Sequence, residues 1–308
     1  GSQIKIDNLT PLQQQSLFKL GKVWGFLKYY HPTVRKGDVN WDYELFRVMP
    51  AVLQARSSDD VNNELAQWTA KLGELKKNKA GKNAPEHDQK IKTNLNWLGD
   101  HKYLGKQLSE LLLTVQQQDR DEKSYYAALQ PGVRNPQFKH ESSYNDLDYT
   151  DDGFMMLSLY RYWNMIEYFF PYKHLTDDKW DDVLNSFIPK MVNVSDDLSY
   201  KLSLIELIGK IQDTHANIWQ RDETLSQFWG KKTAPLQLRF VEEKVVISRV
   251  VNQDFGLKYD LKPGDVITHV NDVTVKDLIA QKIKYSPASN LPTQHRDVMR
   301  KLLQSNAD

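Results

Sequence analysis

Apolar residues recur at helical spacing through the first two thirds of the chain. The run over 17–27 places them three or four positions apart, as on one face of a helix. Just before it, 10–13 reads Thr-Pro-Leu-Gln, which supplies an N-cap, a first-turn proline and a capping-box partner. The pattern predicts a helix that begins at Pro11 and ends before Pro32.

The same pattern occurs a second time, 139 positions further along, with no gap needed between Leu20 and Pro50. The residues that match include Leu20 and Leu159, Trp24 and Trp163, Tyr29 and Tyr168, Pro32 and Pro171, Trp41 and Trp180, and Pro50 and Pro189. Short repeats of 20–50 residues would indicate a solenoid. A spacing this long instead predicts two homologous helical subdomains.

Each copy is predicted to contain three helices. The second helices cover 42–53 and 181–192, and a proline near the end of each is expected to end or kink it. The third helices begin near Asp59 and Asp196. The repeated tryptophans could form a sugar-binding groove, but aromatic residues at helical spacing favour a buried core.

Around Asp213 the helical period gives way to alternation, which is typical of strands. Apolar and polar residues alternate over 236–240, and a second β-rich run covers 245–251, with two glutamates at the bend between them. Further on, 261–272 reads L-K-P-G-D-V-I-T-H-V-N-D. Its Pro-Gly turn lets Asp265 accept backbone N–H groups, a strand follows, and a helix is predicted over 277–284.

These elements predict an α+β protein, with a duplicated, mostly helical N-terminal region followed by a small β-rich domain. The expected ranges are 3–148 for the first copy and a linker, 149–230 for the second copy, and 231–308 for the β-rich domain. The lysine-rich stretch 71–92 is predicted to be a solvated linker, with a polyanion site as the alternative.

Composition narrows the function classes. The 41 Lys and Arg residues nearly balance 40 Asp and Glu residues, which argues against a nucleic-acid partner. The absence of cysteine excludes a disulfide scaffold, a thiol nucleophile and a thiolate zinc site. No spacing of the 8 histidines matches a metal motif, so no metal or cofactor is predicted. No apolar run is long enough to span a membrane.

One motif carries candidate chemistry, the Asp-Thr-His sequence at 213–215. A histidine held in a junction and partly exposed suits a general base, although it could also simply close a turn. No G-x-S-x-G nucleophile motif occurs. The paired aspartates at 151–152, 177–178 and 181–182 lie near predicted helix starts, where they are expected to stabilise the helix dipole.

Three features in this order resemble the front part of a tail-specific (C-terminal-processing) serine peptidase of the tricorn-like branch. They are the W-x-x-x-x-Y-x-x-P repeat, the I-x-x-I-x-D-T-H-A junction, and a PDZ-like module with L-K-P-G-D-V-I-x-x-V-N. The resemblance covers about Leu17 to Leu303. It implies that His215 and Thr214 belong to a catalytic site, although the family usually has serine at the latter position.

The resemblance further implies that a serine nucleophile comes from an α/β domain after the PDZ-like module, so this chain alone is expected to be inactive. In the family's other branch a Ser–Lys dyad acts, and His215 would then be structural. PDZ domains bind extended peptides as an added strand, but the usual Gly-Leu-Gly-Phe carboxylate loop is not visible here. The expected partner is a peptide or protein substrate, and the oligomeric state is open.

Two other interpretations stay open, a peptide-binding adaptor without protease activity and a sugar-binding helical protein. The start at Gly1 and Ser2 is interpreted as a cloning remnant. Family resemblance suggests export, to the periplasm, the outer surface or the medium.

Overall fold

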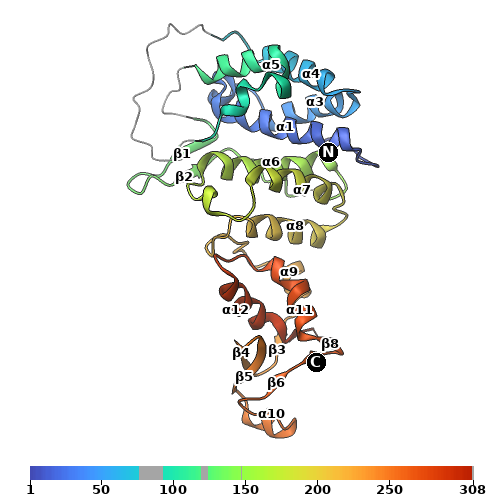
Figure 1. The fold of residues 1–308 in the computed structure, drawn as a ribbon, viewed down its shortest axis with the longest axis vertical. Helices are drawn as coiled ribbons and strands as arrows, with labels where there is room; N and C mark the ends of the chain where they lie inside the picture. The colour runs from blue at the N-terminus through green and yellow to red at the C-terminus, as the bar shows by residue number, and fades with distance from the viewer. Residues whose placement is uncertain (76–92, 119–123, 147, 307–308) are drawn as a thin grey trace. The chain divides into compact units, whose positions relative to one another are not determined.

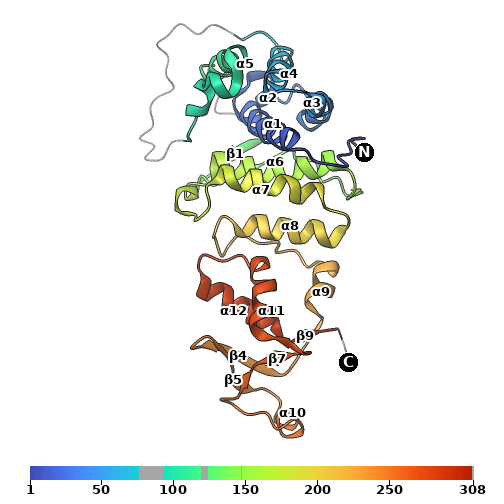
Figure 2. The same ribbon diagram turned by 45° about the vertical axis from the view of Figure 1, so that its right-hand side comes forward.

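The chain forms two compact units, Gly1–Val194 and Ser195–Asp308, here called the first and second unit. The computed structural model describes residues 1–75, 93–118, 124–146 and 148–306. Helices dominate, and the strands form small antiparallel sheets (Figures 1 and 2). The predicted α+β class is confirmed at this level. The boundary between the units falls within the range 149–230 that the sequence grouped together, and most of the predicted lysine-rich linker lies outside the described residues.

The first unit is mostly helical. Its helices are α1 (Pro11–Tyr30), α2 (Pro32–Lys36), α3 (Trp41–Gln54), α4 (Ser58–Ala70), α5 (His101–Gln116), α6 (Asp152–Phe169) and α7 (Trp180–Val192), with 3₁₀ turns η1 (Asn96–Gly99) and η2 (Lys173–Leu175). Strand β1 (Ala127–Leu129) pairs antiparallel with β2 (Pro136–Phe138).

Local signals set the ends of α1 as predicted. The backbone N–H of Gln13 donates to Thr10 Oγ1 at 3.2 Å, and the Thr10 N–H donates to Gln13 Oε1 at 3.0 Å. The helix ends at Tyr30, before His31 and Pro32. Helices α3 and α7 match the predicted ranges closely, and each contains its proline, Pro50 or Pro189, so the proline does not end the helix.

The repeated tryptophans form two pairs with the same hydrogen bonds. The indole N–H of Trp24 donates to the carbonyl of Trp41 at 3.1 Å, and Trp41 returns the bond to Trp24 at 3.1 Å. Trp163 and Trp180 exchange the same two bonds at 2.7 and 3.0 Å. All four side chains are buried, so the core interpretation is confirmed and they do not line a sugar groove.

Close contact between α1 and α6 depends on two glycines of α1. Asn164 Nδ2 donates to the carbonyl of Gly21 at 3.0 Å, and Tyr160 Oη donates to the carbonyl of Leu17 at 2.7 Å. A Cβ atom on Gly25 would lie 1.8 Å from Asn164 Oδ1, so no larger residue fits there without displacing α6. The backbone of α1 therefore packs directly against side chains of α6.

The second unit contains shorter elements. Its helices are α8 (Asp197–Gly209), α9 (Glu223–Trp229), α10 (Gln253–Lys258), α11 (Val275–Lys282) and α12 (Leu291–Leu302), with the 3₁₀ turn η3 (Ile283–Tyr285). Its strands are β3 (Lys232–Thr233), β4 (Leu236–Val241), β5 (Lys244–Val250), β6 (Val266–Ile267), β7 (His269–Val270), β8 (Val273–Thr274) and β9 (Gln304–Ser305). They form the sheets β4-β5-β6, β7-β8 and β3-β9.

The predicted bend at the two glutamates is confirmed, and a second turn of the same kind follows later in this unit. Glu242 and Glu243 both have positive φ in the β4–β5 hairpin, and Asn271 and Asp272 both do so between β7 and β8. Two-residue turns of this kind match the twist of the paired strands. The Pro-Gly turn behaves as predicted too, because the Lys262 N–H donates to a carboxylate oxygen of Asp265 at 2.8 Å.

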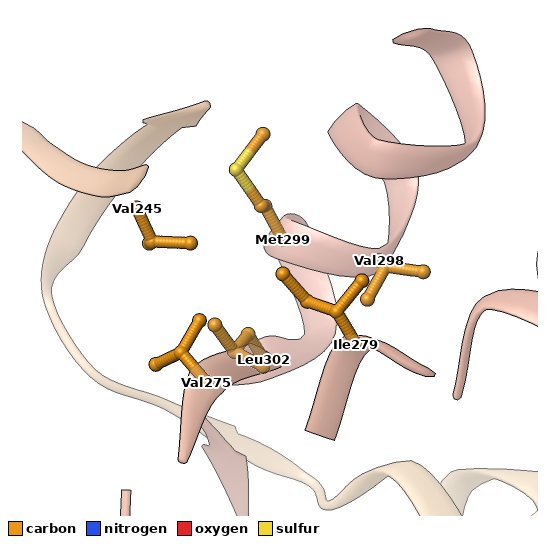
Figure 3. Close-up of a cluster of buried hydrophobic side chains, with 6 residues drawn as sticks. All are labelled: Val245, Val275, Ile279, Val298, Met299 and Leu302. Atoms are coloured by element: carbon orange, nitrogen blue, oxygen red, sulfur yellow. The ribbon is translucent and has the colours of Figure 1, made fainter. Parts of the chain in front are cut away.

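The core of the second unit brings β4 and β5 against α11 and α12, and Figure 3 shows its six buried side chains. Its buried members are Val245, Val275, Ile279, Val298, Met299 and Leu302. Leu238 and Phe240 pack against this cluster from β4, whereas Gln237 and Arg239 are exposed. Because apolar and polar side chains alternate along β4, its apolar face packs on the core and holds the strand beside α12.

Candidate functional site

The Asp-Thr-His motif lies in a turn after α8, and a single carboxylate oxygen organises it. Asp213 Oδ1 accepts the backbone N–H of His215 at 2.8 Å and lies 3.2 Å from its Nδ1 atom. Gln212, just before the motif, has a φ of 52°, in the left-handed region typical of turns. Asp213 was part of the predicted motif, but its contact with the imidazole was not predicted.

The surroundings of His215 differ from the sequence prediction in two ways. Its side chain is 98% exposed, where partial exposure was expected. No strand follows the junction directly, because α9 comes next and the first strand begins at Lys232. The intervening loop is held by its own polar contacts, including a 2.9 Å bond from Trp219 Nε1 to the carbonyl of His215. Trp219 itself is 73% exposed.

Thr214 contacts Ser289 through three hydrogen bonds. Its N–H donates to Ser289 Oγ at 3.0 Å, the two hydroxyl oxygens lie 2.8 Å apart, and the Ser289 N–H donates to Thr214 Oγ1 at 3.1 Å. The Thr214 hydroxyl is therefore directed at Ser289. The next residue, Asn290, caps α12 by accepting the Thr293 N–H at 2.9 Å. The turn that holds His215 is thus tied to the start of α12.

This arrangement leaves one imidazole nitrogen available for chemistry. With Asp213 beside Nδ1, the Nε2 atom of His215 has no hydrogen-bond partner in the described part of the chain. A carboxylate on Nδ1 orients an imidazole so that Nε2 can accept a proton. No described hydroxyl touches Nε2, so the described residues supply a base without a nucleophile.

A groove of about 880 Å³ lies in the same unit, between β4 and α12. Within the described residues β4 pairs only with β5, so its other edge carries no strand. The lining includes Leu238, Phe240 and Met299, which also belong to the core or pack against it. The His295 ring lies 4.4 Å from the Phe240 ring, measured between centroids. The groove therefore combines an apolar floor with polar rims.

Charged side chains of the first unit form a cluster of ion pairs. Lys28 Nζ lies 2.5 Å from Glu141, and Arg161 contacts both Glu141 and Asp42. Tyr144 Oη donates to Asp42 at 2.8 Å. Burial lowers the pKa of Lys28, and the adjacent Glu141 opposes that shift. This cluster joins α1, α3 and α6 to the 141–144 segment, and we interpret it as structural.

Neither a metal site nor a membrane span is found in the described ranges. They contain no group of three or more His, Cys, Asp or Glu residues suited to a metal ion, and none of their helices is long and apolar enough to cross a membrane. Comparison with protein-family models and with curated proteins found no match to this chain.

Proposed function

We propose that this chain is the substrate-recognition part of a serine peptidase similar to the tail-specific family, tricorn-like branch. In this proposal the groove between β4 and α12 holds an extended peptide, and His215 serves as the catalytic base. The observation that carries the proposal is the unpaired edge of β4 facing a groove of about 880 Å³.

Strand addition explains how such a groove would bind a peptide. An edge strand presents unpaired N–H and C=O groups, and an incoming strand satisfies them while alternate side chains enter pockets. The hairpin of β4 and β5, the short strands that follow, and the flanking helix α12 support a PDZ-like assignment. Such a module recognises a backbone conformation first and side chains second.

The role proposed for His215 follows from its fixed ring and its free Nε2 atom. As a general base it would take the proton of a serine hydroxyl during attack on the peptide carbonyl, and would return it to the leaving amine. By the family resemblance, that serine would come from a separate catalytic domain. Thr214, which bonds Ser289, would hold the turn in place and would not transfer the proton.

The helical region is proposed to have arisen by duplication and to act as a scaffold. The two tryptophan pairs with the same reciprocal bonds support common ancestry of the two copies. Their burial supports a scaffolding role over sugar binding. Export is part of the same proposal and rests on the family resemblance alone.

The test of peptide recognition is chemical-shift mapping on the 15N-labelled chain with a pool of unstructured octapeptides. We expect shifts in β4 and α12, with weak affinity because ordering a flexible peptide costs free energy. Leu291→Ala should weaken binding, since Leu291 lines the groove, whereas Leu257→Ala removes another exposed leucine outside it. Shifts confined to other elements would refute the proposed site.

The alternative function is a binding adaptor without catalysis, and the near-complete exposure of His215 favours it. Peptide cleavage by the natural protein that contains this chain separates the two. The peptidase proposal predicts that His215→Ala lowers turnover by several orders of magnitude, as loss of a triad base does. An adaptor would cleave nothing in either form.

A further inference from the structure

The rims of the groove between β4 and α12 carry positive charge only. Arg239 lies on β4, and Arg296 and Arg300 lie on α12, together with His295. No Asp or Glu is among the described residues that line the groove. The whole chain has a formal net charge of only +1, so this concentration of arginine is a local feature.

The charges of these arginines are only partly neutralised by neighbouring residues. Asp297 pairs with Arg296 at 2.9 and 3.1 Å and lies 3.5 Å from Arg300. Arg239 makes no ion pair or side-chain hydrogen bond with any described residue. One carboxylate therefore faces two of three guanidinium groups, and the groove keeps an excess of positive charge.

The arginines also occupy positions that an added strand would reach. Arg239 belongs to the exposed set of β4 residues, while its neighbours Leu238 and Phe240 face the core. Arg296 and Arg300 are one helical turn apart on α12, so they follow the length of the groove. Side chains of a strand lying there would alternate between the two faces of the sheet, so one set would approach Arg239 and the other set would approach Arg296 and Arg300.

We propose that this groove selects extended peptides that carry acidic side chains. The inference rests on the proposed peptide recognition at β4 and adds its specificity. Guanidinium groups bind carboxylates through paired hydrogen bonds, and complementary charge speeds encounter and disfavours cationic peptides. Because the side chains of Arg296 and Arg300 are 51% and 71% exposed, the preference should weaken as salt rises.

The experiment compares two fluorescent octapeptides by anisotropy, one with glutamate at its four central positions, so that carboxylates point to both faces, and one with glutamine at the same positions. At about 0.02 M salt we expect the acidic peptide to bind roughly fivefold to tenfold more tightly, since each exposed ion pair contributes modestly. At about 0.5 M salt the two affinities should converge. Arg239→Gln and Arg300→Gln should each reduce the ratio, whereas Arg221→Gln, with the same charge change outside the groove, should preserve it.

The outcomes separate this inference from the function on which it rests. Equal affinity for both peptides at low salt, with shifts still in β4 and α12, would overturn the acidic preference and leave strand addition intact. An equal loss of preference in Arg221→Gln would show that the preference comes from net charge and not from the groove. That result would also overturn the inference. Failure of both peptides to bind would overturn peptide recognition itself.

Discussion

At His215 one carboxylate oxygen holds both the backbone and the ring of the same residue. Asp213 Oδ1 accepts the His215 N–H and lies within bonding distance of Nδ1, so the ring direction is fixed although the side chain is in solvent. An exposed imidazole would otherwise rotate freely and spend little time in any one orientation. Asp213 is thus a positioning residue in the proposed mechanism.

The tautomer of His215 tests this role without any need for catalysis. In the neutral ring, Asp213 should keep the proton on Nδ1 and leave Nε2 unprotonated. Ring 15N shifts measured with labelled histidine should show this tautomer in the wild type and a mixture in Asp213→Ala. The other histidines in the same spectrum serve as internal controls. An unchanged His215 tautomer in the variant would show that the carboxylate does not orient the ring.

His31 provides a pH-dependent prediction for the first unit. This residue is 1% exposed, neither ring nitrogen has a hydrogen-bond partner among the described residues, and burial lowers the pKa of its imidazole from 6.5 to about 4. Between these values the unfolded chain binds a proton that the folded chain does not, so stability falls as the pH drops from about 6.5 to about 4. The loss should approach about 3 kcal/mol at the acid end.

Urea unfolding at pH 7 and pH 5 measures this effect. His31→Leu should flatten the dependence on pH whatever its packing cost at pH 7, because it removes the titrating group. The control is His101→Leu, which removes an exposed imidazole from the same unit. If the His31 variant keeps the pH dependence of the wild type, the acid sensitivity arises elsewhere.

Sequence reasoning found the residues of the site that are adjacent in the chain and missed those that folding brings there. Thr214 and His215 are visible as a motif, and Asp213 stands beside them. Ser289, which bonds Thr214, lies 75 positions away. Arg296 and Arg300 look like ordinary surface arginines in the sequence, and only the position of α12 beside β4 brings them to a groove.

Helices with strong local signals were predicted well, and those that depend on tertiary contacts were not. A capping box and a terminal proline mark both ends of α1. In contrast, the buried residues of α12 are Val298, Met299 and Leu302, all in its second half. Its first turns therefore lack an apolar period, and the sequence pattern alone does not predict where this helix begins. The strand expected after Asp213 was wrong because a few alternating residues cannot be told from a folded loop.

The contact between α1 and α6 gives a prediction at the level of elements. Gly25→Ala should destabilise the first unit by about 1–3 kcal/mol, because the new methyl group collides with Asn164. That cost should exceed the gain of up to about 1 kcal/mol that alanine brings to a helix interior. Thermal denaturation followed by circular dichroism measures the difference.

Gly99→Ala is the matched control for that change. A Cβ atom there would meet no atom within 4 Å, and Gly99 lies in the same unit. Its free energy of unfolding should stay within about 0.5 kcal/mol of the wild type, as for ordinary surface substitutions. A Gly25 variant as stable as this control would mean that α6 can move away from α1 at little cost.

For the whole molecule, sequence and structure place the start of the last folding unit differently. The sequence predicts that the last domain begins at residue 231, where the strands begin, whereas the compact second unit begins at Ser195. The additional segment 195–230 makes specific contacts with the β-rich part. Glu206 pairs with Lys284 at 3.9 Å, and Thr214 exchanges its hydrogen bonds with Ser289. These contacts make α8 and the Asp-Thr-His turn part of the same body as the groove.

We therefore predict that 195–308 folds when produced alone and that 231–308 is markedly less stable. Both pieces contain the core of Figure 3 and the β3–β9 pairing. Only the longer piece also contains the Thr214–Ser289 contact, because the shorter piece lacks Thr214. Urea unfolding of the two pieces, followed by amide NMR spectra, measures the difference. Peptide binding in the longer piece should match that of the full chain, because every described lining residue of the groove lies within it. Equal stability of the two pieces would mean that the sequence boundary at 231 defines the folding unit, and that 195–230 adds the histidine turn without supporting the groove.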